Sequence, residues 1–241
     1  MIFTTMLLAM QAAAGPTVAP PFSVGEKLEY RGKLLFITAG TATLEVVGVE
    51  EVRGVPSWRF TFETEVSKFG YSNRSVFTSW TGQPDWVSRK FVKDVTENDR
   101  NRHEEFLIHP DSGFYRRNNS PQTKPTSASP LDDVAFFYWI RTVPLEVGRT
   151  YQYSNYFRAE QNPVIVKVEK REEKEMPDGS KVRTLLLRPI VDEENGMFSK
   201  KSKAKLWLTD DARRIPVEIE TNLLIGNLKL ILTSVTPGRA G

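Results

Sequence analysis

The sequence predicts a mainly β protein, in which a single antiparallel meander forms a strongly curved sheet or a β-barrel, with one apolar helix packed against or into it. Many segments alternate apolar and polar residues with a period of two, which is typical of half-buried strands. Only one segment, about residues 130–142, has the character of a helix. Strands do not alternate with helices, so a parallel sheet is not expected.

The alternating segments follow one another through short turns and predict about eleven strands, joined as antiparallel hairpins. One stretch, residues 72–82 (SNRSVFTSWTG), fits a short helix or a twisted strand equally well, and its periodicity does not decide between them. The polar stretch of residues 118–129 has no pattern and is expected to be a loop that leads to the helix. Expected strands cover residues 41–52, 86–95, 102–109, 114–117, 150–157 and 182–189, and the clearest β pattern lies in residues 203–236.

The expected helix has a signal at each end. Ser129 is a natural N-cap, Pro130 suits the first helical position, and Asp132 and Asp133 place negative charge in the first turn. Arg141 places positive charge near the other end. The segment between them, VAFFYWI, is apolar on almost every side, so the helix must be covered on several faces.

The length of 241 residues and the absence of an interdomain linker indicate one β-rich domain over residues 22–236. Residues 1–14 are predicted to be a signal peptide, because an apolar run is followed by an A-x-A-type cleavage site. A Pro-rich spacer follows at 15–21. The apolar run is too short for a transmembrane span. We therefore expect a protein exported to the periplasm of a Gram-negative-type bacterium.

The composition excludes several classes of function. The chain contains no cysteine, which rules out disulfides, thiolate metal sites and a cysteine nucleophile. Its net charge of +3 is spread over many strands and is more typical of solvated strand faces than of a nucleic-acid surface. No nucleic-acid partner and no cofactor are expected.

Three segments together resemble a family of exported bacterial proteins that carries a domain of unknown function, number 3108. The motifs are G-E-x-L-x-Y near the start of the domain, L-D-x-x-x-x-x-Y-x-x-R-T in the helix, and W-L-T-D-D-x-R-R-I-P-V near the end. The resemblance spans roughly residues 22–235. It implies a periplasmic β-rich domain, and it supplies no activity, ligand or catalytic residue.

Motifs for known catalytic chemistry are absent from the sequence, and we do not expect an enzyme. There is no G-x-S-x-G nucleophile turn and no phosphate-binding glycine loop. His103 and His109 lie too far apart on an extended strand to share a metal. The paired carboxylates Asp132 and Asp133 are better explained by the start of the helix, and the pair at 210–211 by a turn. Only a carboxylate-based envelope hydrolase stays as a remote alternative.

The main hypothesis is a periplasmic protein that binds or carries a lipid-like, hydrophobic or amphipathic component of the cell envelope. Aromatic side chains would line its interior, and the expected ligand-binding residues are Phe136, Phe137, Tyr138 and Trp139 of the helix together with Trp80. The deciding question is geometric. A helix that is a lid over a cavity favours a carrier, and a helix that fills the sheet favours a structural protein.

The alternative hypothesis is a structural or assembly factor of the envelope with a packed interior and a protein partner outside. Its contact surface would include an edge strand or a basic face. If residues 201–205 form a strand, then Lys201, Lys203 and Lys205 lie on one face of it. These lysines are the expected surface contacts, and a solvated strand that resists aggregation is the simpler explanation for them.

Overall fold

The strands of the protein form one antiparallel sheet with the order β8-β7-β6-β5-β4-β3-β2-β1-β14-β13-β12-β11-β10-β9. The computed structural model describes residues 19–34, 37–68, 70–193, 197–223 and 226–239. Over these residues the predicted mainly β class with one α-helix is confirmed, with fourteen strands in place of about eleven. The elements are β1 (Lys27–Leu34), β2 (Ile37–Val52), β3 (Val55–Lys68), β4 (Tyr71–Gly82), β5 (Ser88–Glu97), β6 (Arg100–His109), the 3-10 helix η1 (Pro110–Ser112), β7 (Phe114–Arg117), β8 (Thr123–Pro125), α1 (Asp133–Trp139), β9 (Thr150–Tyr153), the 3-10 helix η2 (Ala159–Gln161), β10 (Val164–Glu175), β11 (Lys181–Ile190), β12 (Lys205–Thr209), β13 (Pro216–Leu223) and β14 (Gly226–Thr236).

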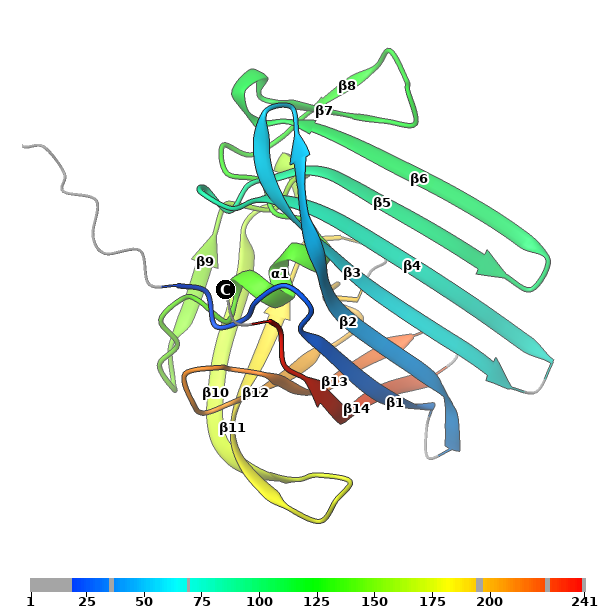
Figure 1. The fold of residues 1–241 in the computed structure, drawn as a ribbon, viewed down its shortest axis with the longest axis vertical. Coiled ribbons are helices and arrows are strands. Elements are labelled where there is room, and N and C mark those ends of the chain that lie inside the picture. Colours follow the sequence, from blue (N-terminus) through cyan, green and yellow to red (C-terminus); the bar gives the residue numbers. More distant parts are fainter. Residues whose placement is uncertain (1–18, 35–36, 69, 194–196, 224–225, 240–241) are drawn as a thin grey trace, which may run out of the picture.

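The first and last strands that the structure describes pair with each other in the middle of the sheet. Lys27 of β1 lies opposite Thr236 of β14, and the ladder continues to Leu34 opposite Leu228. From this central pair, β2 to β8 extend the sheet in one direction and β13 to β9 in the other (Figure 1). The two edges of the sheet, β8 and β9, therefore come from the middle of the sequence.

The predicted signal peptide lies outside the described residues, as does most of the Pro-rich spacer. Within the described segments, no helix is long and apolar enough to cross a membrane.

Helix α1 begins later than predicted. Asp132, not Ser129, is the N-cap, and its side chain accepts hydrogen bonds from the backbone N–H groups two and three residues further on. Leu131 is extended instead of helical, because it pairs with Tyr156 in a short parallel bridge. The capping signal at Ser129 is thus overridden by a tertiary contact just before the helix.

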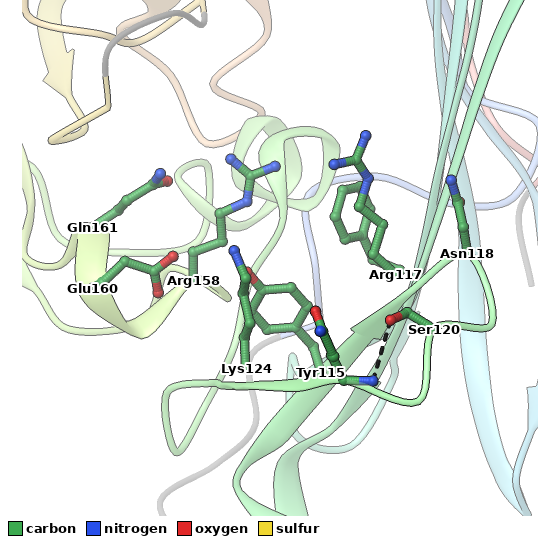
Figure 2. Close-up of a pocket in the computed structure, with 10 residues that line it drawn as sticks. Tyr115, Arg117, Asn118, Ser120, Lys124, Arg158, Glu160 and Gln161 are labelled. Carbon is green, nitrogen blue, oxygen red and sulfur yellow. Dashed lines mark hydrogen bonds between the residues drawn. The ribbon is translucent and has the colours of Figure 1, made fainter.

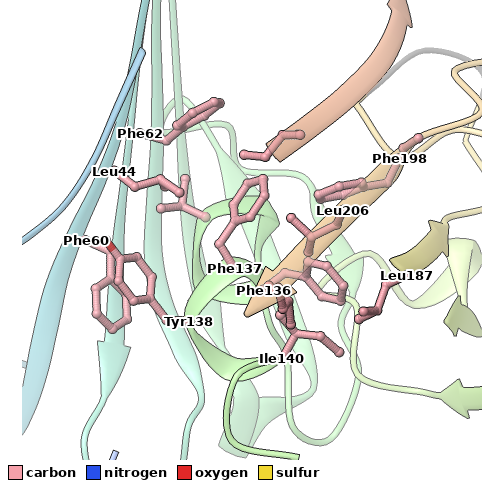
Figure 3. Packing of buried hydrophobic residues seen from close by; sticks show 14 of the residues in the cluster. Leu44, Phe60, Phe62, Phe136, Phe137, Tyr138, Ile140, Leu187, Phe198 and Leu206 are labelled. Carbon is pink, nitrogen blue, oxygen red and sulfur yellow. The ribbon is translucent and has the colours of Figure 1, made fainter. Parts of the chain in front are cut away.

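The curved sheet encloses α1, and side chains fill the space around the helix. Phe62 of β3 contacts Phe137 of α1 with ring centroids 5.6 Å apart. On the other side of the helix, the ring centroid of Phe198 lies 5.4 Å from that of Phe137 and 5.1 Å from that of Phe136. Figure 3 shows the helix between these two groups of apolar side chains. The helix is therefore a packed part of the core that joins the two halves of the sheet.

Local backbone geometry corrects two further predictions. The undecided stretch of residues 72–82 belongs to strand β4. Trp86 has a φ of +56° in the turn before β5, so the strand expected from residue 86 starts at Ser88. The prediction that Lys201, Lys203 and Lys205 share one strand face is wrong. Lys201 and Lys203 lie in a turn, where Lys203 has a φ of +48°, and only Lys205 belongs to β12.

The three segments that carry the family resemblance meet around Arg141. Its guanidinium forms a two-point ion pair with Glu26, with Nη1–Oε1 at 2.6 Å and Nη2–Oε2 at 3.1 Å. Its Nε donates to the carbonyl of Arg213. In the same region, the hydroxyl of Tyr30 donates to the carbonyl of Pro216. These contacts give the motif residues a structural role, in which they join the start of the domain, the helix and the final strands.

Candidate functional site

The segments that follow the two edge strands, β8 and β9, meet through a few hydrogen bonds instead of a ladder, and we call the region between them the seam. It lies between β8 with the segment after it, Thr126–Leu131, and the segment after β9, Asn155–Gln161. A few hydrogen bonds cross the seam. The hydroxyl of Thr126 donates to the carbonyl of Phe157 at 2.6 Å, and the backbone of Leu131 bonds to those of Asn155 and Phe157.

An open polar pocket of about 570 Å³ lies at the seam. This volume falls within the roughly 300–1,000 Å³ that is typical of small-molecule sites. We call it the seam pocket, and Figure 2 shows its charged side chains. Its lining residues come from β6, β7, the loop to β8, β8 itself, and η2 with the residue before it. They are Phe106, Tyr115, Arg117, Asn118, Ser120, Gln122, Lys124, Arg158, Glu160 and Gln161.

Arg158 is the least exposed cation of this pocket, with 22 % of its side chain accessible. Its guanidinium carbon lies 5.4 Å from the ring centre of Phe106 and 5.2 Å from that of Phe157. Burial opposes the charge, but Tyr156 and Asp133 outweigh it and raise the pKa of Arg158. The guanidinium is therefore a fixed positive charge held against aromatic faces.

Two more cations and one carboxylate surround Arg158. Arg117 and Lys124 are exposed, and Arg117 also donates to Glu104 on the neighbouring strand. Glu160 lies on the same wall as Arg158, across the pocket from Arg117 (Figure 2). Burial, reinforced by the negative charge of Glu160, raises the pKa of Tyr115 in the floor, so its phenol stays protonated at neutral pH. The lining thus carries an excess of positive charge.

A partly buried ionic cluster lies behind Arg158, toward the start of α1. Asp133 accepts hydrogen bonds from Lys93 at 2.7 Å and from the hydroxyl of Tyr156 at 2.8 Å. Burial alone would raise the pKa of Asp133, but the positive charge of Lys93 outweighs it and lowers that pKa. Glu193 lies 4.0 Å from Arg158, and burial together with Asp133 raises the pKa of Glu193 to about 7. Arg158 therefore connects this cluster to the seam pocket.

The two carboxylates at the helix start have no substrate-sized space beside them. Asp132 is completely buried, and both of its oxygens accept hydrogen bonds, one from the backbone and one from Ser79 at 2.6 Å. Burial raises the pKa of Asp132 to about 6. The cavity that Asp132 and Asp133 line measures about 10 Å³, which is the volume that a single water needs. Among the described residues, this pair therefore acts in capping and in the ionic cluster.

The aromatic residues that the sequence analysis assigned to a ligand site do not come together in one cavity. Phe136, Phe137 and Tyr138 are buried in the packed core, and Trp139 is half-buried at its border. Trp80 lies on the outer face of β4, where its indole donates to Glu50 and Lys90 covers its ring. The structure separates Trp80 from the helix, because its neighbours Ser79 and Thr81 point inward and the intervening residue points out.

The predicted lysine contacts are dispersed as well. Lys201 and Lys203 are exposed in their turn, and the ammonium of Lys205 bonds to Glu220 at 2.9 Å. His103 bonds to Asp94 on the surface, and His109 stacks on Phe114. No group of three potential metal ligands occurs within the described segments.

Sequence reasoning missed the seam pocket because none of its residues forms a local motif. Arg117 ends a short strand, Lys124 lies in a stretch that reads as a patternless loop, and Arg158 follows β9 in another loop. The only available signal was the presence of cations in two otherwise unpatterned segments. Their proximity depends on how far the sheet curves, which the sequence pattern does not specify.

The sequence matches, over residues 27–233, the family described as "Protein of unknown function (DUF3108)". Among solved structures, the fold is similar to that titled "Crystal Structure of Beta-barrel-like Protein of Domain of Unknown Function DUF1849 from Brucella abortus". The TM-score is 0.55 and the identity 10 %, over 90 % of this chain and 98 % of that chain. At this identity the likeness shows the fold alone. No curated protein matches the sequence.

Proposed function

Because the chain belongs to the DUF3108 family of proteins of unknown function, we propose its function from the site: it is an exported β-barrel-like protein that binds an amphipathic component of the cell envelope. The polar part of this ligand occupies the seam pocket. The apolar part stays outside the sheet, in the membrane or micelle from which the ligand projects.

The contrast between the two cavities carries this proposal. The cavity beneath α1 has room for about one water, whereas the seam pocket is more than fifty times larger in volume and open to solvent. A carrier that encloses an acyl chain needs an empty apolar interior, and side chains from both halves of the sheet fill the described interior here. Recognition of a head group at the seam fits this geometry better than transport inside it.

The proposed periplasmic location is based on the sequence. The apolar run followed by an A-x-A-type site in residues 1–14 supports export to the periplasm. Fractionation of a Gram-negative host that expresses the full chain tests this. We expect a shortened protein in the osmotic-shock fluid, and a variant that starts at residue 15 in the cytoplasm. Equal distribution of the two proteins would contradict export.

The experiment for binding uses vesicles made from the total lipid extract of a Gram-negative envelope. We expect the purified protein to sediment with these vesicles, and the variant Gln122→Trp, which places an indole in the seam pocket, to stay in solution. The matched control is Gln152→Trp, because Gln152 is exposed on β9 and does not line the pocket. Equal sedimentation of both variants, or none by the wild type, would overturn the proposal.

A second function, that of an envelope assembly factor, is favoured by the packed interior and by the open sheet edges. All three residues of β8 are exposed. An exposed edge offers backbone groups to an added strand of another protein. Crosslinking in intact cells separates the two functions. A protein partner that the Gln122→Trp variant still captures, together with no vesicle binding by the wild type, would favour assembly.

A further inference from the structure

The guanidinium of Arg158 has hydrogen-bonding capacity that the protein does not use. Its only charged neighbour within 4.0 Å is Glu193, at the limit of an ion pair, and it donates no side-chain hydrogen bond to any described residue. A guanidinium has five N–H donors in a planar fork that matches phosphate and carboxylate oxygens. Since most of this side chain is buried, water can satisfy only part of the fork.

The surrounding charges favour a doubly charged anion. The lining residues themselves, three cations (Arg117, Lys124 and Arg158) and one carboxylate (Glu160), carry an excess of two positive charges, while Glu104 and Glu193 pair with Arg117 and Arg158 from outside the lining. Figure 2 shows Arg158 on the same wall as Glu160, Arg117 across the pocket from it, and Lys124 between the two arginines. A phosphate monoester carries about −1.5 to −2 charges at neutral pH, whereas a carboxylate carries one.

A second unused group lies on the same wall. The carbonyl oxygen Oε1 of Gln161 is buried and has no hydrogen-bond partner among the described residues. A buried acceptor without a partner costs about 1–3 kcal/mol, and a ligand that donates to it recovers this cost. Gln161 lies near Arg158 and Glu160 in the lining, so the donor must be close to the anionic group of the ligand.

We propose that the seam pocket binds a phosphate group carried on a hydroxylated head group, with Arg158 as the main phosphate ligand and Gln161 as the acceptor for the neighbouring hydroxyl. Arg117 and Lys124 add charge at the mouth, and Phe106 and Tyr115 form the floor. This inference rests on the proposed function, since it names the ligand chemistry of the same pocket. The phosphate can belong to a lipid head group or to a free phosphorylated polyol.

Isothermal titration calorimetry at low ionic strength, with glycerol 3-phosphate, inorganic phosphate and glycerol as probes, tests the chemistry. We expect glycerol 3-phosphate to bind more tightly than inorganic phosphate because it also donates to Gln161, and glycerol not to bind. The affinity for both phosphates should fall as salt is added. No binding of either phosphate by the wild type would overturn the proposal.

Single substitutions test which residues bind the phosphate. Arg158→Met keeps the apolar stem against the two rings and removes the charge, and we expect it to weaken phosphate binding by about tenfold or more. Arg117→Gln should weaken it by about threefold. Arg116→Gln is the matched control on the same strand, because Arg116 lies over Phe114 on the other face of β7 and does not line the pocket. Unchanged affinity in Arg158→Met, or equal losses in the two β7 variants, would overturn the assignment.

If Arg158→Met fails to fold by circular dichroism, Arg158→Lys replaces it, which keeps the charge and removes the fork. We expect a loss of affinity in Arg158→Lys as well, and unchanged affinity would overturn the proposal. For Gln161, the variant Gln161→Met should abolish the preference for glycerol 3-phosphate over inorganic phosphate. A preference that persists would overturn the role of Gln161.

Two arms separate this inference from the proposed function. Vesicles of neutral phosphatidylcholine with a tenth of phosphatidylglycerol phosphate, whose head group carries a phosphate monoester beside a free hydroxyl, test a lipid as the source of the phosphate. Glycerol 3-phosphate tests a soluble source. Binding of the soluble phosphate without vesicle binding would keep the phosphate site and refute the amphipathic ligand. Vesicle binding that Gln122→Trp removes but phosphate does not compete with would keep the proposed function and refute the phosphate site.

Discussion

Asp132 shows how a single carboxylate can be essential for a local structure and still oppose stability at neutral pH. Its side chain caps α1 and accepts from Ser79, while it is completely removed from solvent. The hydrogen bonds favour the charged form and burial disfavours it, and burial prevails, so the pKa rises to about 6. The folded state therefore holds a proton that the unfolded chain releases at lower pH.

We expect the variant Asp132→Asn to gain stability relative to the wild type as the pH rises from about 4 to above 6. Because the folded pKa is the higher one, ionisation lowers the wild-type free energy of unfolding over this range by up to about 3 kcal/mol. Asparagine keeps the capping acceptor without the charge. Urea denaturation at several pH values measures the difference between the two proteins.

The control is Asp99→Asn, which changes an exposed aspartate in the turn between β5 and β6. A difference between Asp132→Asn and the wild type that is constant over this pH range would contradict the prediction. If the stability of Asp132→Asn relative to the wild type fell as the pH rises, the effect would have the opposite sign to the one predicted.

The sequence predicts the role of a residue correctly where its side chain interacts with neighbouring residues of the same segment. The negative charge at Asp132 and Asp133 was correctly placed at the start of the helix. Its aromatic character predicts an interior position for Trp80, but the small polar residues Ser79 and Thr81 are the ones that point inward, toward Asp132. When the inward residues of a strand are polar, the alternation of apolar and polar residues does not show which face of the strand is buried.

At the scale of elements, the sequence predicts that a helix forms and which apolar segment forms it, but not the residues at which it begins and ends. Its apolar body required cover on several faces, and the two halves of the sheet supply that cover. The observed N-cap is Asp132 and not the predicted Ser129, because Leu131 is extended and pairs with a residue beyond β9. Arg141 was predicted to interact with the helix end, whereas it forms an ion pair with Glu26, a contact that only the tertiary structure creates.

We expect Arg141→Met to lower the free energy of unfolding by about 3–5 kcal/mol, because it leaves the carboxylate of Glu26 buried without its counter-charge. Arg141 is 2 % exposed and Glu26 is 6 % exposed. The double variant Glu26→Met with Arg141→Met should lose less than Arg141→Met alone, since no orphan charge remains. Urea denaturation of the three proteins measures these differences.

The control is Arg149→Met, which removes a surface ion pair with Glu146 in which both side chains are largely exposed. It should change the free energy of unfolding by about 0.5 kcal/mol or less. Equal losses for Arg141→Met and Arg149→Met would show that the buried pair contributes no more than a surface one.

At the scale of the whole molecule, the sheet should be most stable around the β1–β14 pair and least stable at its edges. β2 and β3 pair over nearly their full lengths, whereas β8 is a three-residue edge strand that is exposed throughout. We expect amide hydrogens of β1, β2, β3 and β14 to exchange more slowly than those of β8 by on the order of a thousandfold or more. Hydrogen exchange followed by mass spectrometry measures this.

Removal of the chain beyond residue 225 provides the comparison, because it deletes β14 and the partner of β1. We expect this truncation to abolish cooperative unfolding. Equal exchange rates for β3 and β8 in the intact protein, or a truncated chain that unfolds cooperatively, would contradict the central position of the β1–β14 pair.

The class of fold followed from the sequence because alternation and turn residues are local properties. The order of the strands also follows largely from neighbouring hairpins, with one exception that the hairpins do not indicate, the pairing of β1 with β14. That pairing sets which strands become edges and so creates the seam. The seam pocket could not be predicted, because it depends on a non-local pairing and on the curvature of fourteen strands together.

The seam also has a consequence for ligand selectivity. In a closed barrel, strand number and shear fix the circumference, and a wider ligand must break a ladder. Here the described edges are joined by only a few bonds, such as those from Thr126 and Leu131, so the gap can widen while every ladder stays intact. Arg158, by contrast, is held against two rings. The site should therefore tolerate variation in the bulk of its ligands and discriminate sharply by their charge.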